Sequence, residues 1–476
     1  MRALVLLMAG GLALCPLKAA SGDHAPAEVV AAERRANSIA TAAKLLASGI
    51  FVSGRTPEDL LLNDLRTPLY TQHDWRDVSM HIDRVARRVT LSAPGVVPRT
   101  ALYTGEHAQG CVLLPPGETE LLFKPVATPP RPAPGSDAFA GQTPAVQGPL
   151  AEAVASAFAG TPEAAAQHTR ALLVVHRGQL VAEQYAPGFD ANMPQLSWSM
   201  GKTVLAALLG VLARQGALPD LDTPAPIREW RQPNDPRAGI TLRHLLQMSG
   251  GLDCPSPGPQ DANYATTRDI HESIYYGVRD AHALMTSRPL LDPPGSRWQY
   301  RNTNPMALGR ILREIVEKRG ESYLSFPQRA LFDKIGATSF VLETDQSGNF
   351  LITGYDYATA RDWARLGLLL LRDGVAPDGT RLLAPGWVAT LRDPAPAAPN
   401  GRYGGQVWLN RGGAFPSLPR DVFYARGWQE QIVMIFPSHD LVLVRLGHSP
   451  GMNPPADFNP YFDRVAAAIL AALKDS

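Results

Sequence analysis

Lysine is scarce in this chain of 476 residues, which has 7 lysines against 38 arginines. The two basic types together nearly balance the 44 acidic residues, so the formal net charge is only +1. A chain without a surplus of one sign has no broad basic field to attract nucleic acid or anionic membrane, and we expect neither as a partner. Because lysine is scarce, a lysine found within a motif is less easily explained by chance.

Cysteine is scarcer still, with 3 residues in the whole chain. Cys111 and Cys254 are the two that lie beyond the N-terminal segment, and they can pair in an oxidising compartment if their backbones come close enough. The sequence leaves that pairing open. Neither cysteine has a histidine or another cysteine within three residues, and the 11 histidines form no HExxH motif and no close pair. We therefore expect no structural or catalytic metal.

The N-terminus carries an apolar run that is too short to cross a bilayer. Ala3–Cys15 spans 13 residues, whereas a membrane-spanning helix needs about 20. Arg2 precedes this run, and the small residues Ala19, Ala20 and Ser21 follow it. This pattern is typical of a cleaved export signal. We predict a signal peptide over residues 1–21, a periplasmic or secreted protein, and no stable membrane insertion after cleavage; an uncleaved anchor is the alternative.

Composition divides the rest of the chain into two unequal parts. Residues 26–47 predict a helix, and alternating apolar residues between positions 78 and 91 predict short strands. Residues 126–150 are dominated by Pro, Ala, Gly and Thr, which favours a linker. The sequence thus predicts a small N-terminal accessory unit over residues 22–125 and a main domain over residues 151–476.

The main domain begins and ends with predicted strands. Residues 171–176 and 179–185 form one expected hairpin, and residues 431–436 and 441–446 form a second. Helices are expected between and after them, at residues 202–215, 241–248, 304–318, 359–372 and 458–473. Strands at both ends with helices between them predict one mostly antiparallel sheet covered by helices, which is an α/β (α+β) sandwich with a helical insert.

The first chemical motif is Ser199-x-x-Lys202, at the start of the most apolar predicted helix. A serine hydroxyl needs a base to become an effective nucleophile. A lysine three residues later lies on the same helical face, and desolvation by apolar neighbours would lower its pKa so that it can accept the proton. The helix N-terminus favours negative charge on the attacking oxygen. The alternative, a helix-capping serine with a surface lysine, fits poorly with so apolar a helix.

The second motif is Tyr300-x-Asn302, about one hundred residues further along. A phenol beside a lysine can relay a proton to a leaving group. The Asn302 amide can hold a substrate carbonyl or amide and the lysine. A core tyrosine in a turn is the alternative. Because both motifs occur in the same chain in this order, we assign catalytic roles to Ser199, Lys202 and Tyr300, and substrate binding to Asn302.

These motifs carry a resemblance to a known superfamily. The sequences SWSMGK, ITLRHLLQMSGGLD, PPGSRWQYRN and ARGWQEQIVMIFPSHDLVLVRLG resemble those of serine β-lactamases and penicillin-binding proteins. They are most similar to class C β-lactamase-like esterases and 6-aminohexanoate-dimer hydrolases. The resemblance implies an acyl-enzyme on Ser199, with Lys202 as base and Tyr300 as proton relay. It also implies that no metal or cofactor is needed.

The sequence departs from the family at its third motif. Where these enzymes usually carry Lys-Thr-Gly or His-Thr-Gly, this chain has Ala425-Arg426-Gly427. Gly427 still permits close approach of a strand, and the Trp428 backbone N–H can complete an oxyanion hole with that of Ser199. The cation at the first position is lost, and Arg426 should point to the opposite face of its strand.

Three functions are compatible with these motifs, and the missing cation favours the first of them. The first is hydrolysis of a small ester, amide or peptide-like substrate that carries little negative charge. The second is β-lactamase or D-Ala-D-Ala peptidase activity, whose substrates carry a carboxylate that the missing cation would hold. The third is an envelope receptor that is acylated without turnover. Residues 22–125 leave room for a receptor, but no segment is expected to carry a signal across the membrane.

Overall fold

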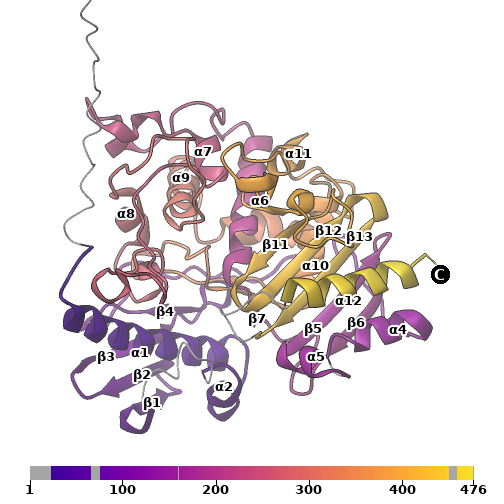
Figure 1. Ribbon diagram of the computed structural model, residues 1–476, viewed down its shortest axis with the longest axis horizontal. Helices are drawn as coiled ribbons and strands as arrows, with labels where there is room; N and C mark the ends of the chain where they lie inside the picture. The colour runs from indigo at the N-terminus through magenta and orange to yellow at the C-terminus, as the bar shows by residue number, and fades with distance from the viewer. Residues whose placement is uncertain (1–22, 66–74, 159, 450–457, 475–476) are drawn as a thin grey trace, which may run out of the picture.

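The computed structural model describes residues 23–65, 75–158, 160–449 and 458–474 (Figure 1). The predicted signal peptide, residues 1–21, lies outside the described residues. Within the described ranges, no helix combines the length and the hydrophobicity that crossing a membrane requires.

A six-stranded sheet forms the centre of the main domain, with every neighbouring pair antiparallel. Its spatial order is β10-β11-β12-β13-β5-β6. The strands are β5 (Thr169–His176), β6 (Gln179–Tyr185), β10 (Trp408–Leu409), β11 (Phe423–Gly427), β12 (Gln431–Phe436) and β13 (Leu441–Gly447). Both predicted hairpins are present, and strands from the two ends of the domain meet where β13 pairs with β5. The predicted antiparallel α/β sandwich is therefore confirmed.

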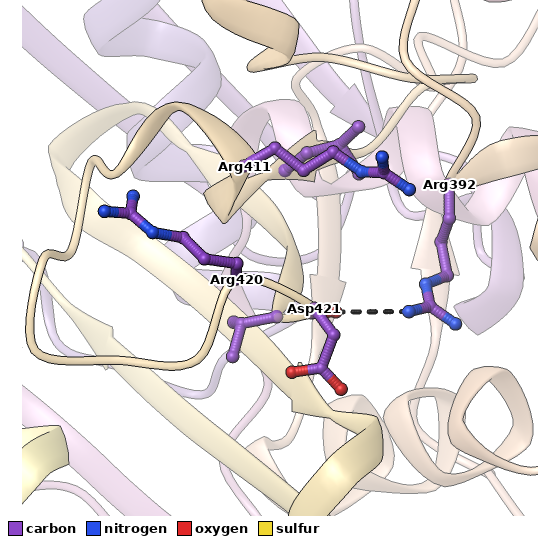
Figure 2. Close-up of a pocket in the computed structure, with 6 residues that line it drawn as sticks. Arg392, Arg411, Arg420 and Asp421 are labelled. Atoms are coloured by element: carbon purple, nitrogen blue, oxygen red, sulfur yellow. Dashed lines mark hydrogen bonds between the residues drawn. The ribbon is translucent and has the colours of Figure 1, made fainter.

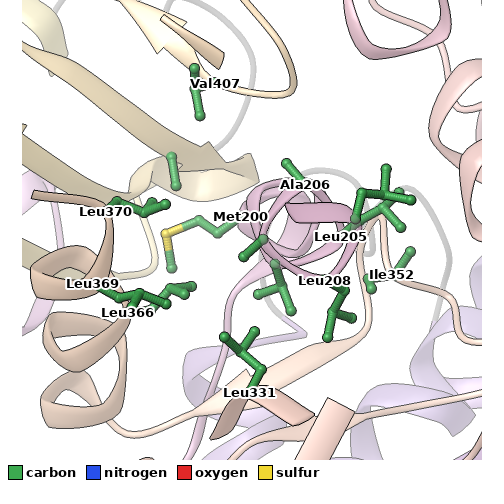
Figure 3. Packing of buried hydrophobic residues seen from close by; sticks show 14 of the residues in the cluster. Met200, Leu205, Ala206, Leu208, Leu331, Ile352, Leu366, Leu369, Leu370 and Val407 are labelled. Atoms are coloured by element: carbon green, nitrogen blue, oxygen red, sulfur yellow. The ribbon is translucent and has the colours of Figure 1, made fainter. Parts of the chain in front are cut away.

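Helices cover both faces of this sheet. Alternate residues of β5 face opposite sides: Leu173 belongs to the core beneath α6 (Gly201–Arg214) and α10 (Ala360–Leu371), whereas Leu172 packs toward α4 (Gly148–Ala155) and α12 (Phe458–Ala472). Figure 1 shows α12 lying across the sheet. Residues 201–212 of α6 are all buried, as expected for a helix that is apolar on all sides. Figure 3 shows α6 surrounded by such side chains, with Met200 between α6 and α10.

The predicted helical insert lies between α6 and α10. It contains α7 (Leu242–Leu246), α8 (Ala281–Thr286) and α9 (Thr303–Lys318), and α11 (Trp387–Leu391) follows α10. Thr241 accepts the backbone N–H of His244 and so caps α7. A small sheet of order β7-β9-β8 joins the insert to the nucleophile segment through β7 (Gln195–Leu196), β8 (Val341–Leu342) and β9 (Asp356–Ala358).

The N-terminal residues form two helices and a second antiparallel sheet. The elements are α1 (Ala27–Phe51), α2 (Pro57–Asn63), β1 (Ser79–Asp83), β2 (Arg88–Ala93), β3 (Val96–Tyr103) and β4 (Cys111–Leu113), and the sheet order is β1-β2-β3-β4. Their buried side chains share one apolar cluster with residues of the main domain, including Trp198, Tyr275 and Met306. Lys44 of α1 forms a fully buried ion pair with Glu343 of the main domain at 2.5 Å.

The Pro- and Ala-rich segment contains neither helix nor strand over residues 126–147. It nevertheless contacts the main domain, because the Arg131 backbone N–H donates to Asp333 and the Phe139 side chain is buried in the central core. The open question of a disulfide is also settled in the structure: Cys111 and Cys254 are both buried free thiols.

Candidate active site

The nucleophile segment enters α6 through a short turn. β7 leads into the 3-10 turn Trp198–Met200, which continues directly into α6, so Ser199 lies at the start of the helix. The Ser197 backbone N–H and hydroxyl both donate to the Asp356 carbonyl at 2.8 Å and fix the turn to β9. Trp198 has φ 51°, a left-handed conformation that is costly for a bulky residue.

Lys202 lies within hydrogen-bonding distance of Ser199. Its Nζ is 2.9 Å from the Ser199 Oγ and 3.1 Å from the Thr353 carbonyl oxygen. The Lys202 side chain is 1% exposed. Burial lowers the pKa of this amine to about 7, although the nearby Asp356 carboxyl acts in the opposite direction. A substantial fraction of Lys202 is therefore uncharged near neutral pH and able to accept a proton.

Tyr300 completes the group. The Lys202 Nζ is 4.9 Å from the centre of the Tyr300 ring. Burial raises the pKa of the Tyr300 phenol, while a hydrogen bond with Ser199 and the positive charge of Arg426 partly offset this effect. The phenol is therefore protonated at neutral pH. The structure thus brings together the three residues that the sequence predicted to be catalytic.

Asn302 lies behind these residues and is fully buried. Its Nδ2 donates to the His271 carbonyl oxygen at 2.8 Å and to the Tyr275 hydroxyl at 3.2 Å. The Tyr275 hydroxyl in turn donates to the Thr353 carbonyl at 2.7 Å, the same oxygen that Lys202 contacts. The Asn302 Oδ1 is buried without a hydrogen-bond partner among the described residues. Its acceptor capacity is therefore unused in this arrangement.

Sequence reasoning missed Thr353, Tyr275 and His271. They come from irregular segments with no motif, and only the fold brings them beside Ser199. Burial and the nearby Lys202 charge hold the pKa of His271 well below its usual value, so its imidazole is neutral. Its Nδ1 accepts the Asn302 backbone N–H at 3.0 Å.

Strand β11 ends beside the nucleophile segment. A Cβ atom on Gly427 would lie 2.0 Å from the Ser197 carbonyl oxygen, so the close approach of the two backbones requires glycine. The ring of the following residue, Trp428, packs edge-to-face on Trp198 with centroids 5.0 Å apart. Gly427 and Trp428, both predicted from the sequence, therefore lie next to the segment that carries Ser199.

Arg426 points away from this region. Its guanidinium lies 5.6 Å from the Phe458 ring of α12 and pairs with Glu430 at 2.5 Å. Ala425, its neighbour on the strand, faces the central core beside α6 instead. The expected orientation of Arg426 is confirmed, and its charge is paired by Glu430. The strand position where the resemblance leads us to expect a cation is occupied here by the methyl group of Ala425.

A separate cavity of about 260 Å³ opens between the end of β10 and the segment that leads into β11. Figure 2 shows Arg392, Arg411, Arg420 and Asp421 around it, with the Arg392 guanidinium donating to the Asp421 backbone carbonyl at 3.3 Å. The Asp421 carboxylate accepts the Ser438 backbone N–H and hydroxyl. The cavity is therefore rich in positive charge, and none of the predicted site residues lines it.

Residues 154–468 match the Beta-lactamase family, and the chain belongs to that family. It is similar to the 6-aminohexanoate-dimer hydrolase of Paenarthrobacter ureafaciens, with 26% identity over 344 residues that cover 68% of this chain and 80% of the relative. Family membership and this hydrolase relative identify the chain as a serine hydrolase of the β-lactamase and penicillin-binding superfamily.

Solved structures share the fold. A Bacillus anthracis protein provisionally named as a 6-aminohexanoate-dimer hydrolase superimposes with a TM-score of 0.58 and 23% identity, covering 73% of this chain and 90% of that one. A penicillin-binding protein homologue from Caulobacter crescentus gives a TM-score of 0.51 and 15% identity, covering 68% and 96%. At these identities the likeness concerns the fold alone.

Proposed function

We propose that this protein hydrolyses esters or amides through an acyl-enzyme on Ser199, with Lys202 as base and Tyr300 as proton relay. The observation that carries the proposal is the 2.9 Å contact between the Lys202 Nζ and the Ser199 Oγ at a fully buried amine. A desolvated lysine in contact with a serine hydroxyl is suited to remove its proton.

The proposed reaction has two stages. The Ser199 Oγ attacks the substrate carbonyl carbon, its proton passes to the Lys202 Nζ, and the carbonyl oxygen becomes an oxyanion. The backbone N–H groups of Ser199 and Trp428 stabilise that oxyanion. The bond to the leaving group breaks as Tyr300 relays the proton from Lys202 to it. Water then attacks the acyl-enzyme, which releases the acid and restores the Ser199 hydroxyl.

The proposed substrate is a small ester, amide or peptide-like molecule without a carboxylate near the scissile bond. Ala425 offers no cation where many relatives have one, and Arg426 is engaged by Glu430 on the other face of the strand. The curated relative is named for a dimer of 6-aminohexanoate, so amides belong among the substrates to test. Asn302 is the proposed substrate-binding residue, which requires that its buried, unpartnered Oδ1 becomes exposed when the substrate enters.

We also propose that the protein acts in the periplasm or outside the cell, after removal of residues 1–21. The division into a unit over 22–125, a linker over 126–150 and a hydrolase domain over 151–476 remains a prediction.

Three reagents test the proposed function: a fluorophosphonate probe, a short p-nitrophenyl ester and a chromogenic cephalosporin. We expect labelling by the probe, rapid turnover of the ester and slow cleavage of the cephalosporin. Fast cephalosporin cleavage would favour the β-lactamase or D-Ala-D-Ala peptidase alternative. Stoichiometric labelling without turnover of any substrate would favour the acylated receptor.

The Ser199→Ala variant should lose fluorophosphonate labelling completely, because the hydroxyl is the proposed site of the covalent bond. Its circular dichroism and thermal midpoint should match those of the wild type, since only one oxygen atom is removed. Labelling that persists in the folded variant would assign the nucleophile to another residue.

A further inference from the structure

Both proposed oxyanion donors have a left-handed neighbour. Trp198, with φ 51°, immediately precedes Ser199, and Gln429, with φ 60°, immediately follows Trp428. Glu430, the next residue, is also left-handed at φ 66°. Bulky residues hold this conformation only where the surrounding structure fixes them. The positions of the two N–H groups therefore depend on what holds Trp198 and Gln429.

A hydrogen bond between their side chains joins Trp198 and Gln429. The Trp198 indole Nε1–H donates to the Gln429 Oε1 at 3.2 Å, and the Gln429 side chain is buried at 4% exposure. Because the indole nitrogen can only donate, the amide oxygen must face Trp198 and the amide nitrogen must face the other way. The bond thus links the residue before the nucleophile to the turn after β11.

The amide nitrogen of Gln429 is held by His448. The distance from the Gln429 Nε2 to the His448 Nε2 is 2.8 Å, so this imidazole nitrogen accepts and the ring is neutral. Burial and the Arg170 charge lower the pKa of His448 to about 3, against the opposing effect of Asp64. The acceptor form therefore persists across the neutral range, and the Gln429 amide has a partner at each end.

The N-terminal unit lies behind His448. The Asp64 Oδ1 is 3.9 Å from the His448 Nε2. Asp64 pairs with Arg55 at 2.6 Å and with Arg170 of β5 at 3.0 Å. The far end of the Gln429 network is thus packed against charged groups that both parts of the chain supply.

The backbone of the turn has separate anchors on β13 and just after it. The fully buried Arg445 donates to the carbonyl oxygens of Gln429 at 3.2 Å and Glu430 at 2.7 Å, and the Ser449 N–H donates to the Gln429 carbonyl at 3.2 Å. These bonds hold the turn to the sheet. The Gln429 side chain adds the hydrogen bond that ties it to the segment carrying the nucleophile.

We propose that Gln429 is a positioning residue for the oxyanion hole: its amide, bridging Trp198 and His448, sets the spacing between the Ser199 and Trp428 backbone N–H groups. This inference rests on the proposed acyl-enzyme function and extends it. The oxyanion forms only as the carbonyl is attacked, so loss of the bridge should act on kcat rather than on binding of the ground-state ester.

The test compares two buried glutamines. Gln429→Leu removes the bridge, and we expect kcat for a p-nitrophenyl ester to fall roughly 10- to 100-fold with KM changed less than about threefold, somewhat less than the loss of a whole oxyanion donor. Gln109→Leu is the matched control, because the Gln109 amide is also buried but bonds to the Val126 backbone and the Thr128 hydroxyl, away from the turn after β11. Its kcat should stay near that of the wild type even if its thermal midpoint falls. Equal kcat losses in both variants would overturn the proposal.

A double-mutant cycle identifies the bond itself. Trp198→Phe keeps an aromatic ring but removes the indole donor, so we expect it to lower kcat as Gln429→Leu does, and the double variant to fall no further. Additive losses would show that the two residues act independently. If Gln429→Leu does not fold, a normal kcat in Trp198→Phe alone would also refute the inference. Failure of wild-type Ser199 to react with the fluorophosphonate would instead refute the proposed function.

Discussion

The chemistry of Lys202 follows from its surroundings. An ammonium group in a buried position loses most of its hydration, and this loss exceeds the stabilisation that the Asp356 carboxyl provides. The pKa therefore falls to about 7 rather than remaining near that of an exposed lysine. The residue can then exchange a proton with Ser199 under physiological conditions.

This pKa predicts a definite pH dependence. The active form of Lys202 is the free amine, so kcat/KM should rise as the pH increases through about 7 and fall tenfold per unit below it. Ester hydrolysis measured from about pH 5 to about pH 9, with spontaneous hydrolysis subtracted, reports this limb for the free enzyme. Lys202→Arg, which stays protonated throughout, should be inactive across the range. A flat wild-type profile would remove Lys202 from the role of base.

Tyr300 should contribute through its hydroxyl alone. Tyr300→Phe retains the ring beside Lys202 but cannot carry a proton, and turnover should fall by roughly 10²-fold or more, the usual scale for a lost acid–base group. Steady-state kinetics on an ester with a poor leaving group is the most sensitive measurement, because such a group needs protonation most. Unchanged turnover in this variant would exclude Tyr300 from proton transfer.

At the scale of elements, the site depends on the close approach of β11 to the turn before α6. Gly427 has φ −116° and ψ 162°, which any residue can adopt, so glycine is needed there for space and not for conformation. A side-chain carbon would meet the Ser197 carbonyl at 2.0 Å and force the strand and the turn apart. The proposed oxyanion donors lie on those two segments.

Gly427→Ala should therefore reduce kcat/KM by about 10²-fold, the scale of a displacement of about 1 Å at a reacting centre. Gly239→Ala is the control, because a Cβ atom at position 239 would meet nothing within 4 Å. Ester kinetics and thermal midpoints should be measured for both variants, and only Gly427→Ala should lose activity. Similar kinetics in the two variants would mean that the close approach does not shape the site.

At the scale of the whole molecule, the N-terminal unit is built into the core. Its apolar side chains share a cluster with Trp198 and Tyr275 beside the nucleophile. Lys44 reaches into the main domain, where it pairs with Glu343 and lies 5.0 Å from the Tyr355 ring. Tyr355 in turn contacts Trp198 with ring centroids 5.6 Å apart. A change in α1 can thus reach the site through direct packing.

Removing the Lys44 charge should destabilise the whole protein. Lys44→Met leaves the buried Glu343 carboxylate without its cation, and loss of one partner of a buried pair typically costs about 3–5 kcal/mol. Urea unfolding should show a lower midpoint, and Lys44→Met combined with Glu343→Gln should recover part of the loss. Lys318→Met, on an exposed position of α9, should change stability by less than about 0.5 kcal/mol. Equal effects at both lysines would contradict this account.

The sequence by itself determined the elements and the reactive groups. Apolar periodicity and turn residues predicted both hairpins and the main helices, because these signals are local. The spacing in Ser199-x-x-Lys202 is also local, since one helical turn brings the two side chains together. The convergence of Tyr300 with them was predictable from the pairing of motifs, and the structure shows it.

Only the tertiary structure decided the surroundings of those groups. Thr353, Tyr275 and His271 lie far from Ser199 in the sequence and belong to no motif, so their contacts exist only once separate segments pack together. Gln429 follows the third motif, but its contact with Trp198 also depends on that packing. The burial that lowers the Lys202 pKa, and the sharing of one core between the N-terminal unit and the main domain, likewise arise from packing between distant parts of the chain. A local pattern can specify which groups are present, but the solvent exclusion and spacing that govern their chemistry depend on the whole fold.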